Sequence, residues 1–544
     1  MATISTTTGN TDNRSSTPNS TTTANATNNN GNEQQTKVTE TLNLNDPGYK
    51  SVVQFYRGKS ILITGATGFV GKVLLEKILR TCPNVERIYL LMRCGTKDGK
   101  PPAARLNDLF ESRAFSFAKE TLPLEKVVAI SGDMTAPGLG LSPADRETLV
   151  RNVNVVFHSA ATVRFHGPLR DFVKQNVLGT EQIMILSKEM PNLESVIFVS
   201  TAYANCNLLD IEEKVYPLER SAQTLIDEIL TADDNDAPLV GDPRLMGRPN
   251  SYTMSKAIAE NMVREKYSDL PVVICRPSIV THSYKEPTDG WCDSMNGLAG
   301  TLLLGGLGIA RTMEMHCDFN ADIIPVDFVA NSLLVIGWHT ARYADQRQPV
   351  IHITSGVKNP VRWGEILNYA RMGALRSPSM KLVRPIARNP VSARGLLGKA
   401  NHLFVKFFSH FVFAFLFDLF LMVTGNPRVM VKVTRKMHRA FDVLEHFTNR
   451  EWCFRYHAYQ RIFAQLSDDE KEQFVSDVER IDWKQYCDTL TLGSRRFLLN
   501  EDDSTIEPAR RRQRFLSTVY LIFDSTLYLL MFAIALYLGK LMVM

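Results

Sequence analysis

A glycine-rich turn near the start of the chain restricts the possible folds most strongly. Residues 64–71 have the sequence Thr-Gly-Ala-Thr-Gly-Phe-Val-Gly, and they lie between an apolar run at 61–63 and a helical pattern of apolar residues. In such a turn the first glycine permits a tight bend, the second lets backbone N–H groups approach a phosphate, and the third lets the helix pack on the strand. The helix N-terminus adds positive partial charge. We therefore expect a dinucleotide to contact Gly65, Thr67, Gly68, Phe69, Val70 and Gly71.

Short apolar runs recur along the chain after this turn. They lie at residues 88–91, 127–130, 153–157, 196–199 and 272–275. Each has the length of a strand buried on both faces, and the segments between them have helical spacing. Strands that alternate with helices are typical of a parallel sheet covered on both sides. The predicted fold class is therefore α/β, with a Rossmann-type doubly wound parallel sheet over residues 51–385.

The segments on either side of this unit have a different composition. Residues 1–48 are rich in Thr, Ser and Asn and cannot bury enough apolar surface to offset the cost of ordering, so they are predicted to be disordered. Residues 386–500 lose the alternation and predict a mostly helical second domain. The net charge of +5 is too small to indicate nucleic-acid binding. The 8 cysteines include no CxxC pair, so no metal site is predicted, and reduced thiols in a reducing compartment are expected.

The C-terminal segment is apolar from residue 515 to 538 and follows a basic cluster at 510–514. About 20 apolar residues are enough to cross the hydrocarbon core of a bilayer. The segment therefore predicts a transmembrane or membrane-embedded helix whose basic flank stays on the cytoplasmic side. Asp524 within it leaves a buried core helix as the alternative.

The residue at the end of the second predicted strand indicates the choice of dinucleotide. An acid there would bind the ribose hydroxyls of NAD, but the strand ends in Arg93, about 20 residues past the glycine turn. A guanidinium can clamp a 2′-phosphate, so NADPH is the predicted cofactor; a surface arginine without this role is the alternative. Asp133 and Met134 are expected near the adenine, and Ala160 and Ala161 near the pyrophosphate and ribose.

A tyrosine and a lysine four residues apart predict the proton-handling chemistry. Tyr252 and Lys256 form a YxxxK motif, and this spacing places both side chains on one face of a helix. A neighbouring ammonium lowers the pKa of a phenol, whose usual value is about 10. Tyr252 is then expected to give a proton to a developing alkoxide, and Lys256 to hold the ribose hydroxyls as well.

Hydroxyl and amide side chains are expected to complete the site. The strand at 196–199 ends in Ser200 and Thr201, and one of these hydroxyls, Thr201 in preference, is predicted to hold the substrate oxyanion. Asn176 either braces the site and contacts the cofactor or only packs its helix. Three residues after the sixth strand are expected to contact the nicotinamide: Pro277, Ser278 and Ile279.

Together these motifs resemble the extended short-chain dehydrogenase/reductases, and more closely the fatty acyl-CoA reductases of animal or insect type. The matching segments are TGATGFVGK, IYLLMR, NVLGT, FVSTAYAN, YTMSKAIAE and VVICRPSIV. The resemblance covers residues 50 to 500. It continues at Gly425–Arg428 and around Trp452 and Trp483, which resemble the C-terminal male-sterility domain of that family. The Thr/Asn-rich extension at the N-terminus is atypical.

The resemblance implies a reaction and partners that the residues alone do not. A long-chain acyl-CoA is reduced to a primary alcohol with release of coenzyme A, at the expense of two NADPH. Thr201 and Tyr252 stabilise the oxyanion, thiolate leaves, and the aldehyde takes a second hydride with Tyr252 as the acid. An acyl chain needs an apolar tunnel, so residues 403–423 are expected to form a tunnel wall or to contact membrane lipid, with a plain core helix as the alternative.

The resemblance also implies a location. The protein is expected on a membrane with its catalytic domain facing the cytosol, at the endoplasmic reticulum rather than the peroxisome. Two other classes compete: another extended reductase acting on a sterol or lipid carbonyl or a sugar nucleotide, and an inactive membrane scaffold. The membrane segment and Arg93 disfavour a sugar-nucleotide epimerase, and the intact Tyr252/Lys256 pair disfavours a scaffold. Acyl chain length, aldehyde release and oligomeric state stay open.

Overall fold

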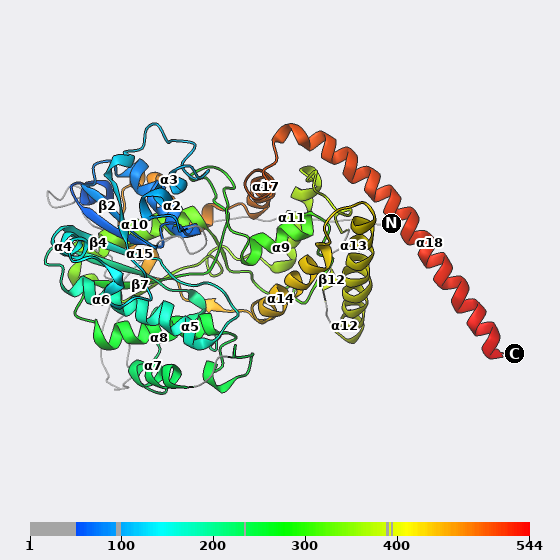
Figure 1. Cartoon of the computed structure of the whole chain (residues 1–544), viewed down its shortest axis with the longest axis horizontal. Helices are drawn as coiled ribbons and strands as arrows, with labels where there is room; N and C mark the ends of the chain where they lie inside the picture. The colour runs from blue at the N-terminus through cyan, green and yellow to red at the C-terminus, as the bar shows by residue number, and fades with distance from the viewer. Residues whose placement is uncertain (1–50, 94–98, 233–235, 388–390, 393–394, 544) are drawn as a thin grey trace, which may run out of the picture. The chain divides into compact units, whose positions relative to one another are not determined.

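Strands between residues 60 and 353 form a seven-stranded parallel sheet in a computed structural model that describes residues 51–93, 99–232, 236–387, 391–392 and 395–543 (Figure 1). The strand order is β11-β7-β5-β4-β1-β2-β3, with every neighbouring pair parallel. The strands are β1 (Ser60–Thr64), β2 (Arg87–Met92), β3 (Val127–Ser131), β4 (Val153–His158), β5 (Ser195–Val199), β7 (Val272–Pro277) and β11 (Val350–Ile353). The predicted doubly wound sheet and its six strands are confirmed, and β11 is a seventh that sequence reasoning missed.

The sheet is buried on both faces because alternate residues of each strand point to opposite sides. Ile61 and Ile63 of β1 belong to one apolar cluster, and Leu62 belongs to another. Helices α2 (Phe69–Thr81) and α10 (Val326–Arg342) cover the first side, and α4 (Pro143–Asn152), α6 (Gly179–Lys188) and α8 (Ser251–Lys266) cover the second. The functional segments lie where the strands end, in the loops that connect them to these helices.

The C-terminal third of the chain is mostly helical, as predicted for residues 386–500. Its helices include α14 (Met430–Thr448), α15 (Ala458–Ala464) and α17 (Trp483–Gly493). Tyr459 and Trp483 lie in the same apolar core as the first face of the sheet. Helix α17 also packs against α11 (Trp363–Arg376). The division of these helices into a separate domain stays a prediction.

A long apolar helix lies between the sheet and α14 in the sequence. Residues Gly398–Val423 form the one helix in the described part of the chain that is long and apolar enough to cross a membrane. It consists of α12 (Gly395–Phe404), the π-helical η7 (Val405–Val412) and α13 (Phe413–Val423). Only 17% of its most apolar window is buried, and Phe407 and Phe415 are 58% and 63% exposed. The alternative of a plain core helix is therefore wrong for this segment.

Asp418 is the acidic residue within this apolar helix, and the structure gives it a structural role. Its carboxylate accepts hydrogen bonds from the three backbone N–H groups that precede and open α14: Val429 at 2.9 Å, Met430 at 2.8 Å and Val431 at 2.9 Å. These groups have no partner within the helix, and the helix dipole favours an anion beside them. Asp418 therefore joins α13 to α14.

Some predictions concern segments that the structure covers only in part. Residues 1–48 lie outside the described residues. Helix α18 (Ile506–Val543) includes the whole of the predicted segment 515–538, and Phe515 and Ile522 are exposed on it. The side chains of Asp524 and of residues 527–543 lie outside the description, so a membrane span stays a prediction. All seven described cysteines are free thiols.

Candidate active site

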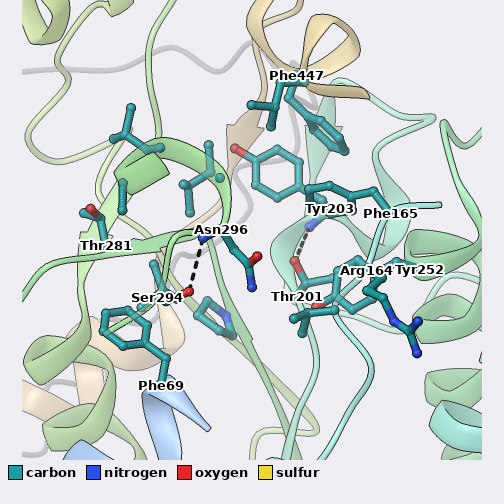
Figure 2. Close-up of a pocket in the computed structure, with 18 of the residues that line it drawn as sticks. Phe69, Arg164, Phe165, Thr201, Tyr203, Tyr252, Thr281, Ser294, Asn296 and Phe447 are labelled. Carbon is teal, nitrogen blue, oxygen red and sulfur yellow. Dashed lines mark hydrogen bonds between the residues drawn. The ribbon is translucent and has the colours of Figure 1, made fainter. Parts of the chain in front are cut away.

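A cavity of about 880 Å³ opens at the carboxyl ends of the central strands (Figure 2). In doubly wound sheets ligands bind at this edge. The cavity brings together most of the predicted site: Gly65, Thr67, Gly68, Phe69, Val70, Ala161, Ser200, Thr201, Tyr252, Lys256, Pro277, Ser278 and Ile279 all line it. Residues of α9 (Gly297–Gly306), α11 and α14, which were not predicted to take part, form its other wall.

The backbone of the glycine turn is packed too closely for a side chain at Gly65 or Gly71. Gly65 has a φ of +77°, and a Cβ there would lie 2.7 Å from the backbone nitrogen of Ala160. A Cβ on Gly71 would lie 2.2 Å from the carbonyl oxygen of Gly65, so α2 packs directly on the turn, as expected for the third glycine. Gly68 caps α2 without a side-chain hydrogen bond. The free N–H groups at this helix start fit a pyrophosphate, so the residues present suit a nicotinamide dinucleotide.

A buried histidine holds the end of β4 against the glycine turn. Its Nε2 contacts the Thr180 hydroxyl at 2.9 Å, and because that hydroxyl donates to a backbone carbonyl, His158 is the donor. Nδ1 of His158 therefore accepts from the Thr64 hydroxyl at 2.7 Å, which in turn accepts the N–H of Ala160 at 3.2 Å. Burial, and the charge of Lys256, lower the pKa of His158 to about 3. A neutral imidazole thus positions the backbone at Ala160.

Asn176 lies behind this backbone and does not line the cavity. Its amide oxygen accepts the N–H of Thr162 at 2.8 Å, and its amide nitrogen donates to the Thr162 carbonyl at 3.1 Å and to the Ser255 hydroxyl at 2.9 Å. The side chain is 1% exposed. Of the two roles expected for Asn176, the geometry favours bracing the loop after β4.

The residues predicted for the adenine end do not line the cavity. The register that pairs Thr64 with Leu91 places Arg93, which is exposed, beside the glycine turn. Asp133 accepts hydrogen bonds from the backbone N–H and the hydroxyl of Thr135, at 2.9 and 2.8 Å. Met134 packs against Gly179, where a Cβ would lie 3.0 Å from the methionine Cε. These residues follow β2 and β3, on one side of β1, whereas the cavity lies towards β4 and β5 on the other side. Only a dinucleotide that extends across the end of β1 would reach both.

Tyr252 is a protonated phenol in this structure. Burial raises its pKa to about 12, and a hydrogen bond with Thr201 opposes the rise. The prediction that Lys256 lowers this pKa is wrong for the protein alone. The Lys256 ammonium donates to the Val199 carbonyl at the end of β5, at 2.8 Å, and burial lowers its own pKa to about 8. Desolvation is the largest cause of both shifts.

The structure distinguishes the two hydroxyls at the end of β5. Ser200 donates to a carboxylate oxygen of Glu260 at 2.6 Å and is 3% exposed. Thr201 hydrogen-bonds Tyr252 and accepts the N–H of Tyr203 at 3.3 Å. Thr201 and Tyr252 therefore present their hydroxyls to the cavity as a pair, as Figure 2 shows. The geometry favours Thr201 over Ser200 as the oxyanion donor.

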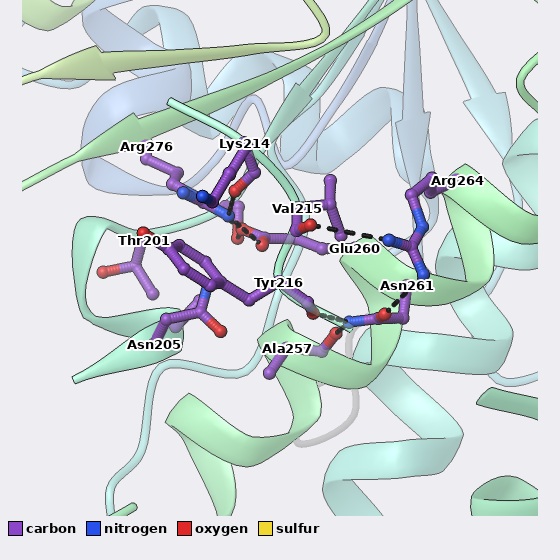
Figure 3. A network of polar contacts seen from close by, with 12 residues as sticks. Thr201, Asn205, Lys214, Val215, Tyr216, Ala257, Glu260, Asn261, Arg264 and Arg276 are labelled. Carbon is purple, nitrogen blue, oxygen red and sulfur yellow. Dashed lines mark hydrogen bonds and ion pairs between the residues drawn. The ribbon is translucent and has the colours of Figure 1, made fainter. Parts of the chain in front are cut away.

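Sequence reasoning missed the acid that binds the Ser200 hydroxyl. Glu260 forms a buried ion pair with Arg276, whose Nε and Nη2 lie 2.9 and 2.6 Å from the two carboxylate oxygens (Figure 3). Arg276 is fully buried and also donates to the Lys214 carbonyl at 2.9 Å. Since Glu260 follows Lys256 by four residues, the acid continues the face of α8 that carries the YxxxK motif. That spacing was the signal that could have identified it.

The wall opposite the glycine turn is apolar. The ring of Phe447 on α14 lies 5.8 Å from Phe165, and Phe165 lies 5.8 Å from Tyr252. Further apolar side chains of this wall are Leu298, Met313, Met315, Trp363, Leu367, Val443 and Leu444. Residues 403–423 do not line the cavity, so the prediction that they form its wall is wrong. A polar reaction centre therefore adjoins a compartment suited to a hydrocarbon chain.

The sheet, the glycine turn and the Tyr–Lys pair define a nicotinamide-dependent reductase with a Rossmann fold. Sequence profiles described as "Male sterility protein" match residues 63–333 and 409–501, and Fatty acyl-CoA reductase 1 of Xenopus laevis is 39% identical over 493 residues, which cover 89% of this chain and 93% of that protein. The chain belongs to the fatty acyl-CoA reductase family. The human proteins Fatty acyl-CoA reductase 1 and 2 are 38% and 35% identical, with coverage of 89% and 88% of this chain and 93% and 92% of their own lengths.

Solved structures confirm the fold. The terminal R domain from the myxalamid PKS-NRPS biosynthetic pathway superposes with a TM-score of 0.53 at 20% identity, over 80% of this chain and 91% of that one. The reductase domain of a non-ribosomal peptide synthetase from Mycobacterium tuberculosis also has a TM-score of 0.53, at 18% identity, over 81% and 92%.

Proposed function

We propose that this protein reduces long-chain fatty acyl-CoA to the primary alcohol, releases coenzyme A and uses NADPH. The names of its relatives support the substrate class. The observation that carries the proposal is one cavity in which the Thr201–Tyr252 hydroxyl pair lies between a glycine turn and an apolar compartment. A cofactor at the turn and an acyl chain in the compartment would place the carbonyl beside these two hydroxyls.

Thr201 and Tyr252 bind and protonate the reacting oxygen in this proposal. Bound NADPH supplies a hydride to the carbonyl carbon. The two hydroxyls donate hydrogen bonds to the oxyanion that develops from the thioester, which stabilises it where water is excluded. Collapse of the oxyanion expels the thiolate, since a thiol with a pKa near 8.5 is a good leaving group. The aldehyde would then occupy the same donors, and a second NADPH, bound after the oxidised cofactor leaves, would supply the hydride that converts it to an alkoxide. Tyr252, with its pKa of about 12, protonates that more basic alkoxide.

Arg93 supports the choice of NADPH over NADH. It is exposed at the end of β2, beside the glycine turn, where the 2′-position of the adenine ribose would lie. A guanidinium forms charge-assisted hydrogen bonds to phosphate that the hydroxyl of NADH cannot replace. Asp133 and Met134, at the end of the next strand, would flank the adenine.

Membrane attachment is the remaining part of the proposal. Residues 515–538 within α18 would span or embed in a bilayer, with the basic cluster at 510–514 on the cytosolic side. The exposed apolar helix at residues 398–423 would contact lipid. We place the protein at the endoplasmic reticulum rather than the peroxisome, with a mostly helical second domain at 386–500.

Product analysis tests this function. The detergent-solubilised full chain, given hexadecanoyl-CoA and NADPH, should yield hexadecanol and free coenzyme A by mass spectrometry. Tyr252→Phe should lower turnover by about 10²–10⁴-fold, because the proton donor is lost, while NADPH binding persists. Tyr284→Phe is the control, since its hydroxyl donates to the Arg480 carbonyl outside the cavity. Oxidation of NADPH by a keto-steroid or another lipid carbonyl but not by acyl-CoA would replace the proposed substrate, and unchanged turnover in Tyr252→Phe would remove the mechanism.

A further inference from the structure

A second hollow, distinct from the catalytic cavity, lies between α13 and α14. Its volume is about 820 Å³. One wall consists of Phe415, Asp418, Leu419 and Met422 from α13. The other wall carries a row of five cations: Arg428, Lys432, Arg435, Lys436 and Arg439. We call this row the α14 cation row.

The α14 cation row is free to bind an anion. All five side chains are exposed, and within the part of the chain that the structure describes none of them forms an ion pair, although the charge of Arg428 acts on the Asp418 carboxylate. Asp418, the acid in the same hollow, is committed to the backbone at the start of α14. Five like charges on adjoining turns repel one another and are stabilised by a ligand with several negative charges.

Arg439 connects the cation row to the reaction centre. It lines both the hollow and the catalytic cavity, and the next turns of α14 continue the cavity wall with Val443, Leu444 and Phe447. With a helical rise of 1.5 Å per residue, Arg439 lies about 12 Å along α14 from Phe447, and Lys432 lies about 22 Å from it. A ligand that extends from the reaction centre along α14 therefore meets its first cation, Arg439, about 12 Å beyond Phe447.

The acyl chain has a different compartment. A small apolar hollow of about 90 Å³ shares Thr301, Met313 and Leu367 with the catalytic cavity. It continues between α9 and α11 past Gly305 and Ala370. This branch and the apolar wall of Val443, Leu444 and Phe447 suit the hydrocarbon, and the glycine turn suits the dinucleotide. The part of α14 from Arg439 towards its N-terminus is therefore left for the other half of the substrate.

We infer that the α14 cation row binds the phosphates of coenzyme A, the 3′,5′-bisphosphorylated adenosine end of an acyl-CoA whose pantetheine arm passes Arg439. Guanidinium and ammonium groups are the side chains that phosphate prefers. The inference rests on the proposed function and adds to it a binding site for the leaving half of the substrate. Because phosphate groups also occur in lipid headgroups, and exposed Phe415 and Leu419 line the same hollow, the test separates the two sources.

Substrates with and without the phosphates provide the kinetic test. In the full chain, Lys432→Gln/Arg435→Gln/Arg439→Gln should raise KM for hexadecanoyl-CoA at least about tenfold, because charge-assisted hydrogen bonds are lost. KM for S-hexadecanoyl-pantetheine and for hexadecanal should change less than about twofold, since neither carries a phosphate. The matched control removes three exposed cations remote from both hollows, Lys119→Gln/Arg151→Gln/Arg220→Gln, and should leave all three KM values unchanged.

Direct binding provides a test that does not depend on turnover. Adenosine 3′,5′-bisphosphate should bind the wild-type full chain in calorimetry and bind the triple variant at least about tenfold more weakly. Equal binding, or an equal rise of KM for all three substrates, overturns the inference. Unchanged kinetics with loss of flotation on phosphatidylserine vesicles also overturns it and assigns the row to lipid headgroups. If the wild-type protein binds the bisphosphate but does not turn over acyl-CoA, the proposed function is wrong and the proposed phosphate-binding site is retained.

Discussion

The two sides of the catalytic cavity are built on different principles. One side lies at the strand ends and includes the glycine turn, the loop after β4 and the start of α8; we call it the rigid side. Close backbone contacts and side-chain hydrogen bonds hold it in place. Gly65 and Gly71 leave no space for a Cβ. Thr64, His158 and Thr180 form a continuous series of hydrogen bonds. The helical wall of α9, α11 and α14 consists of apolar side chains and exposed cations. Reaction geometry therefore depends on the first side, and substrate range on the second.

A matched pair of glycine substitutions is the sharpest test of this comparison. Gly71→Ala should abolish measurable NADPH binding, because its Cβ would lie 2.2 Å from the Gly65 carbonyl oxygen and push α2 away from the turn. Gly305→Ala in the helical wall should have almost no effect, since its Cβ would meet no atom within 4 Å. Fluorescence titration with NADPH measures both. Normal binding by Gly71→Ala would show that the turn is not the rigid side.

The two hydroxyls at the end of β5 test whether the rigid side acts through one specific group. Thr201→Val should lower kcat by about 10²–10³-fold, the loss expected for one oxyanion donor. Ser200→Ala should lower kcat less than about tenfold, because Ser200 only supports Glu260, which keeps its pair with Arg276. Single-turnover kinetics at saturating acyl-CoA measure both variants. The reverse ranking would assign the oxyanion to Ser200.

The outer end of the rigid side should decide between the two nicotinamide dinucleotides. Arg93→Glu should raise KM for NADPH by about 10- to 100-fold, since a charge-assisted contact is replaced by repulsion, and should change KM for NADH little. Arg87→Glu, at the opposite end of the same strand, is the control. Initial rates with each dinucleotide measure the effect, and a proportional rise for both would remove the role of Arg93.

The smallest effect is expected in the helical wall. Gly305→Leu should place a side chain in the apolar branch between α9 and α11, since the Cβ itself meets no atom within 4 Å. The ratio of kcat/KM for octadecanoyl-CoA to that for dodecanoyl-CoA should fall by about tenfold, since a few methylenes of a chain are excluded. Competition between the two acyl-CoA substrates measures this ratio. An equal loss for both chain lengths would mean that the branch does not hold the acyl chain.

Local patterns were enough to predict much of the rigid side. Six strands appeared as apolar runs, and Tyr252 and Lys256 were found by their spacing on a helix. Strand β11, with the sequence Val-Ile-His-Ile, was missed because His352 interrupts its apolar run, whereas most of the predicted strands appeared as continuous apolar runs. Thr201 could not be separated from Ser200 until Glu260 was seen to occupy the serine hydroxyl.

The helical wall was beyond local reasoning. The apolar spacing of α14 predicts an amphipathic helix, but its partner surface is set by residues that are remote in the sequence: Phe447 meets Phe165 and Tyr203. The pKa of Tyr252 was likewise misjudged, because burial depends on everything packed around the phenol. Exposure of residues 398–423 also depended on packing, since an apolar core helix and an apolar surface helix have the same composition.

The sequence by itself determined the sheet, the glycine turn, the Tyr252/Lys256 pair and the family, because each depends on residue types at short, regular spacing. Only the tertiary structure decided which hydroxyl faces the substrate, which helices close the cavity and where a row of cations lies relative to it. Those features depend on contacts between segments hundreds of residues apart, and the free energy of such contacts depends on three-dimensional packing that no local pattern encodes.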